Sequence, residues 1–146
     1  MIFKRSLFFS LSLVLSGCAG LSGAPTVTTV CSFDQAWGVA LTSVSEFELR
    51  KIDEEGGTIE TDWIAVSSRT AGGPLKRNVN QERLRFFVNL EAHQTGTSIS
   101  VHQAREFFSP YGVQSQSQAW RRIPAVPEEE QRLVNRIHNK LEAKGC

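Results

Sequence analysis

Three cysteines carry the side chains best suited to covalent chemistry in this 146-residue sequence. Cys18 follows an aliphatic residue and two small ones, Leu15–Gly17. Small residues before a thiol let an extended backbone lie close within the groove of a processing peptidase, so Cys18 is a candidate for covalent modification. Cys31 and Cys146 lie near the two ends of the remaining chain and are candidates for a disulfide.

The segment before Cys18 has the organisation of an export signal. Lys4 and Arg5 precede a short apolar stretch, residues 6–15. This stretch is shorter than the about 20 residues that span a bilayer, but it has the length of a signal-peptide core. Together with the tetrapeptide Leu-Ser-Gly-Cys, it resembles the signal peptide and lipobox of bacterial lipoproteins.

The resemblance implies removal of residues 1–17, a diacylglyceryl group on the Cys18 sulfur and acylation of the new N-terminus. Several acyl chains hold a protein stably on a membrane, whereas a single chain binds only marginally. Ala19, rather than Asp, follows the cysteine. In Gram-negative lipoproteins this implies sorting to the outer membrane, and we expect the protein to face the periplasm there. A Gram-positive source would instead leave it on the cytoplasmic membrane.

The charge balance argues against a nucleic-acid ligand. Loss of Lys4 and Arg5 with the signal leaves 14 of the 16 basic residues against 15 acidic residues, a net charge of −1. Nucleic-acid binding needs a concentrated basic face. No second apolar run of spanning length is present, so the lipid is the predicted membrane attachment.

Residues 18–30 are rich in small residues, Gly and Pro, and are predicted to form a flexible tether to a single domain, residues 31–146. In an oxidising periplasm the two cysteines left after lipidation are expected to pair. A Cys31–Cys146 bridge would close a loop of most of the domain, which the chain-entropy model values at roughly 4–5 kcal/mol. The alternative is two thiols that never meet.

No pattern of metal-binding or catalytic residues is found. The histidines His93, His102 and His138 lack partners at metal-ligand spacing, and there is no nucleophile motif such as G-x-S-x-G. We therefore expect no metal, no cofactor and no enzyme activity.

Periodicity predicts two helices. Ser32 and Gln35 form a capping box, and apolar residues at helical spacing continue to about Ser45. The second helix begins at Pro127, carries acidic residues in its first turn and ends at Gly145.

Four strands are predicted between the helices, within residues 47–53, 58–68, 81–93 and 98–108. A change in alternation near Trp63 indicates a β-bulge. Residues 68–80 and 109–119 are interpreted as loops. The predicted fold is α+β with two layers and the order αββββα: a four-stranded antiparallel sheet with both helices packed on one face.

Residues 32–143 resemble one helix-grip unit of the BamC (NlpB) family of outer-membrane lipoproteins. The resemblance depends on a helix that contains Phe33-x-x-Ala36-Trp37, an acidic turn with Gly56, and a second hairpin turning at Gly96. It implies a helix-grip fold and an outer-membrane location. BamC proteins carry two such domains after a long N-terminal segment, whereas this chain has one domain and a short tether.

Alternation places several apolar and cationic residues on the sheet face opposite the core. Because Trp and Arg are favoured at protein interfaces, this face is the predicted partner-binding surface. Its candidate residues are Arg85, Phe87, His102, Phe108, Trp120 and Arg121. We therefore expect a non-catalytic interaction module for other envelope proteins, with a role in envelope or outer-membrane assembly.

The alternative function is a carrier of a small lipid or other apolar ligand. Helix-grip folds can hold such a ligand between helix and sheet. However, four strands and two short helices are expected to leave little room for a cavity of hundreds of Å³.

Overall fold

The computed structural model describes residues 23–66, 81–108 and 120–146. The signal peptide, Cys18 and the two predicted loops lie outside these residues, so the predictions about them are not addressed by the fold. Among the described helices, none combines the length and apolar character needed to cross a bilayer.

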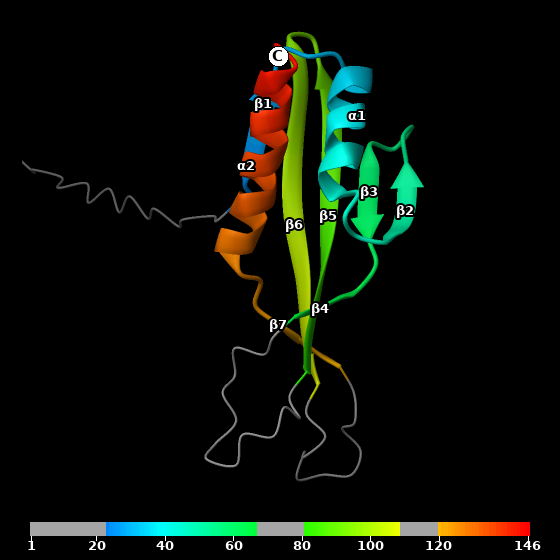
Figure 1. Cartoon of the computed structure of the whole chain (residues 1–146), viewed down its shortest axis with the longest axis vertical. Helices are drawn as coiled ribbons and strands as arrows, with labels where there is room; N and C mark the ends of the chain where they lie inside the picture. The colour runs from blue at the N-terminus through cyan, green and yellow to red at the C-terminus, as the bar shows by residue number, and fades with distance from the viewer. Residues whose placement is uncertain (1–22, 67–80, 109–119) are drawn as a thin grey trace, which may run out of the picture.

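The described chain forms one seven-stranded antiparallel sheet and two helices (Figure 1). The elements are β1 (Thr26–Thr29), α1 (Phe33–Val44), β2 (Leu49–Asp53), β3 (Thr58–Thr61), β4 (Ile64–Val66), β5 (Gln81–His93), β6 (Gly96–Phe108), β7 (Arg121–Ile123) and α2 (Pro127–Ala143). The predicted four-stranded sheet of order αββββα is therefore wrong. The additional strands are short, and each pairs with a longer neighbour.

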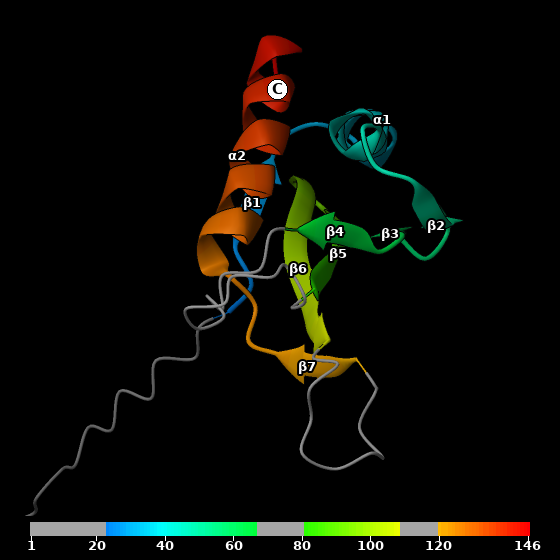
Figure 2. The ribbon, with the colours of Figure 1, turned by 60° about the horizontal axis from the view of Figure 1, so that its bottom comes forward.

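The long hairpin of β5 and β6 is the axis of the sheet. At one end the strand order is β1-β6-β5-β3-β2, while β4 pairs with β5 and β7 pairs with β6 near the other end. Figure 2 shows β7 at the far end of this hairpin. Because β5 and β6 each have 13 residues, each has room for two successive partners along its outer edge.

Part of the predicted tether belongs to the sheet. Thr26–Thr29 pair in antiparallel register with β6, from Thr26 opposite Ser100 to Thr29 opposite Thr97. The segment consists of β-branched residues, which suit an extended backbone. The folded unit therefore begins before Cys31, the predicted domain start.

A β-bulge separates β3 from β4 and confirms the prediction made near Trp63. Glu60 faces Phe87, and Ile64 faces Leu84, so three residues of one strand lie opposite two of the other. The Thr61 hydroxyl accepts a hydrogen bond from the Phe86 N–H at 3.0 Å, which replaces a ladder bond in the gap. The extra residue changes the phase of the alternation.

Both helices lie on the same face of the sheet and run antiparallel to each other (Figure 1). The capping box at the start of α1 is present: Gln35 N–H donates to the Ser32 hydroxyl, and Ser32 N–H donates to the Gln35 side chain. Pro127 opens α2, as predicted. The core between helices and sheet consists of Ala36, Trp37, Val39, Ala40, Val44, Ile59, Leu84, Phe86, Val88, Leu90, Ile99, Val101, Leu133, Val134, Ile137 and Leu141.

A buried ionic network attaches the start of α2 to the sheet. Arg105 on β6 is only 2% exposed and donates from Nε and Nη2 to Glu82 on β5, at 2.9 and 2.7 Å. Its Nη1 reaches Glu129 in the first turn of α2 at 2.8 Å. The Gln103 side chain also donates to Glu129, at 2.6 Å. Charges at this depth are tolerated because they are paired and hydrogen-bonded.

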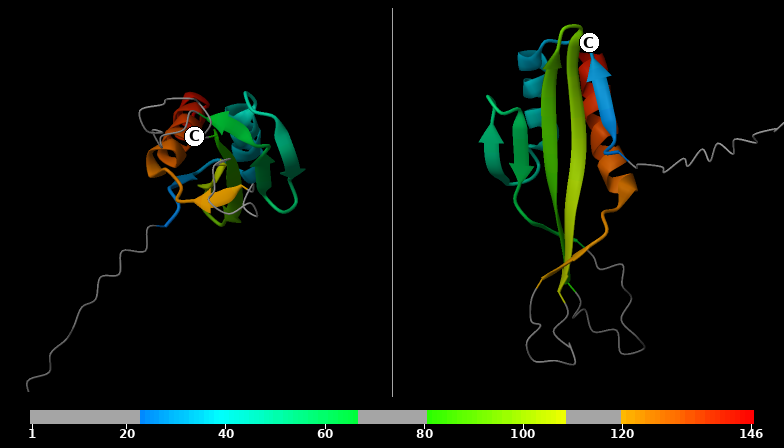
Figure 3. Two further views of the ribbon diagram at one scale, coloured as in Figure 1. Left: turned by 90° about the horizontal axis from the view of Figure 1, so that it is seen from below. Right: turned by 180° about the vertical axis from the view of Figure 1, so that it is seen from behind.

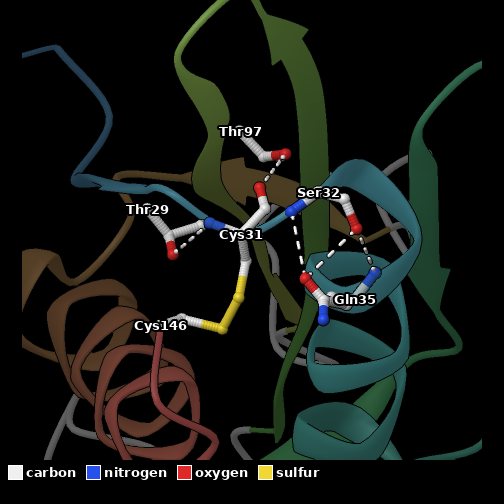
Figure 4. The surroundings of a disulfide bond; sticks show 6 residues. All are labelled: Thr29, Cys31, Ser32, Gln35, Thr97 and Cys146. Carbon is white, nitrogen blue, oxygen red and sulfur yellow. Dashed lines mark hydrogen bonds between the residues drawn. A yellow bond between two sulfur atoms is a disulfide. The ribbon is translucent and has the colours of Figure 1, made fainter.

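Cys31 and Cys146 form a disulfide pair, with their Cα atoms 5.3 Å apart (Figure 4). The bond joins the residue before the α1 cap to the last residue after α2. The antiparallel helices bring these two ends together, and the predicted pairing agrees with the structure. The Thr97 hydroxyl donates to the Cys31 carbonyl at 3.1 Å, which also attaches this point to β6.

Two turns depend on local backbone chemistry. Gly96 begins β6 with φ of 144°, and a Cβ there would lie 1.9 Å from the Thr29 carbonyl oxygen, so glycine permits β1 to approach the hairpin. In the β2–β3 turn, the Asp53 carboxylate accepts hydrogen bonds from Lys51 Nζ and Gly56 N–H, both at 2.9 Å. These bonds lower the pKa of Asp53, the Lys51 bond most strongly.

Candidate interaction surface

The face of the sheet opposite the helices is uncovered by any described helix. From behind, the strands face the viewer and both helices lie beyond them (Figure 3, right). We call this surface the open face. The open face includes Arg50, Glu60, Trp63, Arg83, Arg85, Phe87, His102, Glu106, Phe108, Trp120 and Arg122.

Arg83 is the centre of an aromatic and ionic cluster on this face. Its guanidinium carbon lies 4.2 Å from the Trp63 ring centroid and 4.0 Å from the Trp120 ring centroid. The same guanidinium donates from Nε and Nη2 to Glu106 Oε2, at 2.9 and 2.6 Å. Contacts of a cation with an aromatic face contribute about 0.5–2 kcal/mol each. One arginine therefore organises three side chains that come from β6 and from the segments before β4 and β7.

Arg85 continues the cluster along β5. Its guanidinium lies 4.0 Å from the Trp63 centroid, and its Nη1 donates to Glu60 on β3. Arg50 on β2 lies 3.5 Å from the same carboxylate. The Arg85 side chain is nearly buried, and its Nε has no hydrogen-bond acceptor within the described part of the chain.

Cations outnumber carboxylates across this cluster. Arg50 and Arg85 share Glu60, while Arg83 binds Glu106. Arg122 on β7 is a further cation, and its register places it beside Glu106. The residues of the open face named above carry four guanidiniums and two carboxylates, a local excess of positive charge that favours an acidic partner surface. Further along the same face, Lys51 adds one cation, and Asp53 and Glu91 add two carboxylates.

Of the six residues predicted for a binding surface, five lie on the open face and Arg121 does not. Phe87 and His102 are direct cross-strand partners, and the Phe108 ring lies 5.4 Å from the Trp120 ring. Arg85 lies on the same face but is only 8% exposed, so it supports the surface more than it presents a free charge.

Arg121 does not belong to the predicted surface. Its register partner is Phe107, whereas the neighbouring Arg122 is opposite Glu106. Since partners in an antiparallel pair share a face, Arg121 points away from the open face and Arg122 points with it. A phase could not be assigned from the sequence to a three-residue strand.

The sequence interpretation missed Trp63, Arg83, Glu60 and Glu106 as members of the site. Arg83 was already on the right face by alternation with Arg85 and Phe87. Its importance depends on register: β6 places Glu106 directly opposite it, and the bulge brings Trp63 alongside. The sequence did contain one sign of this contact: Arg83 and Glu106 lie on the same predicted face of two neighbouring strands, and their charges are opposite.

The three histidines lie apart from one another, and each is exposed on the surface. His93 Nε2 is 2.9 Å from the Ser98 hydroxyl, and His138 is 3.4 Å from Glu142 on the surface of α2. His102 is exposed opposite Phe87. Within residues 23–66, 81–108 and 120–146, no group of three or more side chains is arranged to hold a metal ion.

Comparisons with known proteins do not assign the chain to a family. No protein-family model matches the chain, and no curated protein matches it either. The resemblance to BamC lipoproteins therefore stays a prediction.

Proposed function

We propose that this protein is a lipoprotein of the outer membrane, anchored through Cys18 and facing the periplasm, that acts without catalysis by binding another envelope protein through its open face. The export signal and lipobox support the location. The arrangement of side chains on the open face supports the mode of action.

The observation that carries this proposal is the Trp63–Arg83–Trp120 cluster. Tryptophan and arginine supply most of the binding energy at many protein interfaces. Here Arg83 is already held by two aromatic rings and by Glu106. A partner would therefore meet side chains that are largely fixed, and little conformational entropy would be lost on binding.

The excess of guanidinium groups defines the partner's chemistry. An acidic patch would gain from Arg83 and Arg122, and its approach would be accelerated by the opposite charge. Phe87 and Phe108 add apolar area beside these charges. We infer a partner surface that combines carboxylates with apolar or aromatic side chains.

The tether restricts where that partner lies. Five residue-to-residue steps separate Cys18 from Gly23, the first described residue, with residues 19–22 between them. At most about 3.6 Å per residue, they reach about 18 Å. Lipidation at Cys18 would thus hold the domain close to the bilayer, and its partner would be an integral or peripheral protein of the same membrane. This agrees with a role in envelope or outer-membrane assembly, which the resemblance to BamC also supports.

Site-specific photocrosslinking in intact cells tests the proposal. Benzoylphenylalanine replaces His102, which is exposed on the open face, or His138, whose side chain is 48% exposed on α2 and serves as the control. We expect a discrete protein adduct from position 102, identified by mass spectrometry, and none from position 138.

A second variant ties the adduct to the cluster. Arg83→Glu reverses the central charge, while Arg121→Glu, at an exposed residue of β7 that points away from the open face, serves as the matched control. We expect Arg83→Glu to reduce the adduct roughly tenfold or more, as expected for a charged contact at an interface. Equal adducts from positions 102 and 138, or no protein adduct from 102, would refute the proposal.

A further inference from the structure

An apolar groove lies on the helix-bearing side of the sheet, away from the open face. It has a volume of about 230 Å³ and is bordered by β4, β5, the segment after α1 and α2. Its apolar lining consists of Phe47, Ile64, Val66, Leu84, Phe86 and Leu133. The sequence had led us to expect little room here, because only four strands and two short helices were predicted.

The groove is a consequence of where α1 ends. α1 stops at Val44, and Phe47 then packs on Phe86 with ring centroids 5.9 Å apart, forming one wall. Ile64 and Val66 extend the floor because β4 pairs with β5 beyond the bulge. At the start of α2, the contacts between Glu129 and Arg105 hold the opposite wall against the sheet.

Among the described residues that line the groove, three are charged, and two of these already have strong partners. Glu129 accepts from Arg105 at 2.8 Å, and Arg136 donates to Glu46 and to the Ser43 carbonyl. Arg132 differs from both. Its side chain is 71% exposed, its Nε lies 3.3 Å from the Glu128 carbonyl, and its Nη2 is 4.0 Å from Glu129. Arg132 therefore has guanidinium N–H groups to offer a ligand at the groove.

We infer that this groove binds a medium-chain fatty carboxylate, with its acyl chain on the apolar lining and its carboxylate on Arg132. A cavity of about 150 Å³ holds benzene, whereas drug-sized ligands occupy roughly 300–1,000 Å³. A groove of about 230 Å³ lies between these and suits a short unbranched chain. Carboxylate and guanidinium form paired, charge-assisted hydrogen bonds, which orient the chain into the groove.

The test uses the full-length protein in isolated membranes and a decanoic acid that carries a photoactivatable diazirine on its chain. Irradiation is followed by digestion and mass spectrometry. We expect the label on peptides that contain β4 or the first half of α2. Excess octanoate is expected to compete for labelling.

Matched variants separate the charge from the apolar lining. Arg132→Glu is expected to reduce labelling roughly tenfold or more, as for loss of a charged hydrogen bond, while Lys144→Glu at the other end of α2 leaves it unchanged. Val66→Trp fills the groove and is expected to abolish labelling. Resistance to limited proteolysis equal to that of the unsubstituted protein shows that each variant folds, and if Val66→Trp fails this check, Arg132→Glu decides.

Three results would overturn the inference. Label spread over peptides remote from the groove would remove the site. Equal labelling of Arg132→Glu and Lys144→Glu would remove the role of the guanidinium. A photoactivatable decanol that labels as well as the acid would show that the carboxylate is not recognised.

Discussion

Replacing both Cys31 and Cys146 by alanine is expected to lower the free energy of unfolding by about 5 kcal/mol. The disulfide joins residues 115 positions apart. Loop-closure entropy for a loop of this length corresponds to about 4.8 kcal/mol at 25 °C. Because many domains have only about 5–15 kcal/mol in total, this loss would remove a large part of the stability.

Urea unfolding of the purified protein, followed by far-ultraviolet circular dichroism, measures this loss. The Cys31→Ala/Cys146→Ala variant is compared with the oxidised protein and with the protein in reductant. We expect the variant to be about as stable as the reduced protein and less stable than the oxidised protein. The slope of unfolding free energy against urea is expected to rise in the variant, since its unfolded chain is less compact. Ser32→Ala, in the adjacent cap, is the control and should cost about 1 kcal/mol with an unchanged slope.

The reasoning would be refuted if the double variant lost no more stability than the Ser32→Ala control and kept the same slope. It would equally be refuted if Cys31 and Cys146 in the oxidised protein reacted freely with an alkylating reagent. Either result would mean that the bond does not restrict the unfolded chain as its position requires.

Three further predictions concern the fold. Gly96→Ala should destabilise the protein by about 1–3 kcal/mol or more, because the φ of 144° disfavours a side chain and the added Cβ would lie 1.9 Å from the Thr29 carbonyl oxygen. Thermal unfolding measures the loss of stability, and an unchanged unfolding midpoint would argue against the close approach of β1 to Gly96. Arg105→Ala should cost about 3–5 kcal/mol in urea unfolding, since Glu82 loses a buried cationic partner; a cost below that of a typical surface substitution would show that the network is dispensable. The hydrogen bond from Lys51 lowers the pKa of Asp53, so the stabilisation is present above the pKa of the unfolded chain and is lost as the pH falls through the folded pKa. A carboxyl NMR titration should find the Asp53 midpoint below the ordinary value for aspartate, and a midpoint at or above it would contradict the turn geometry.

The helices and the long hairpin were predictable because their signals are local. The Ser32 capping box and Pro127 mark helix starts through chemistry within a few residues. The alternation along β5 reflects one face buried against helices. Even the bulge near Trp63 left a trace, because an inserted residue shifts the phase of apolar positions.

The short strands were not predictable because their stability comes from their partners. β1 lies in a stretch of small residues and threonines, and it is ordered by pairing with β6. β7 has three residues, too few to reveal an alternation. A prediction from local pattern therefore finds the central hairpin and misses the strands added to its edges.

The candidate surface was likewise predictable only in part. Alternation alone placed Phe87 and His102 on one face, and they are cross-strand partners. The contacts of Arg83 with Trp63 and Trp120 join segments far apart in sequence, and they depend on the exact register and on the bulge. Such contacts become visible only when the strands are placed side by side.

Mass spectrometry of the N-terminal peptide of the native protein, isolated from membranes, determines whether the protein is lipidated at Cys18. We expect the mature chain to begin at Cys18 and this residue to carry a diacylglyceryl group and an N-terminal acyl chain. An unmodified Cys18, or a chain that retains residues 1–17 in a freely diffusing protein, would contradict this expectation.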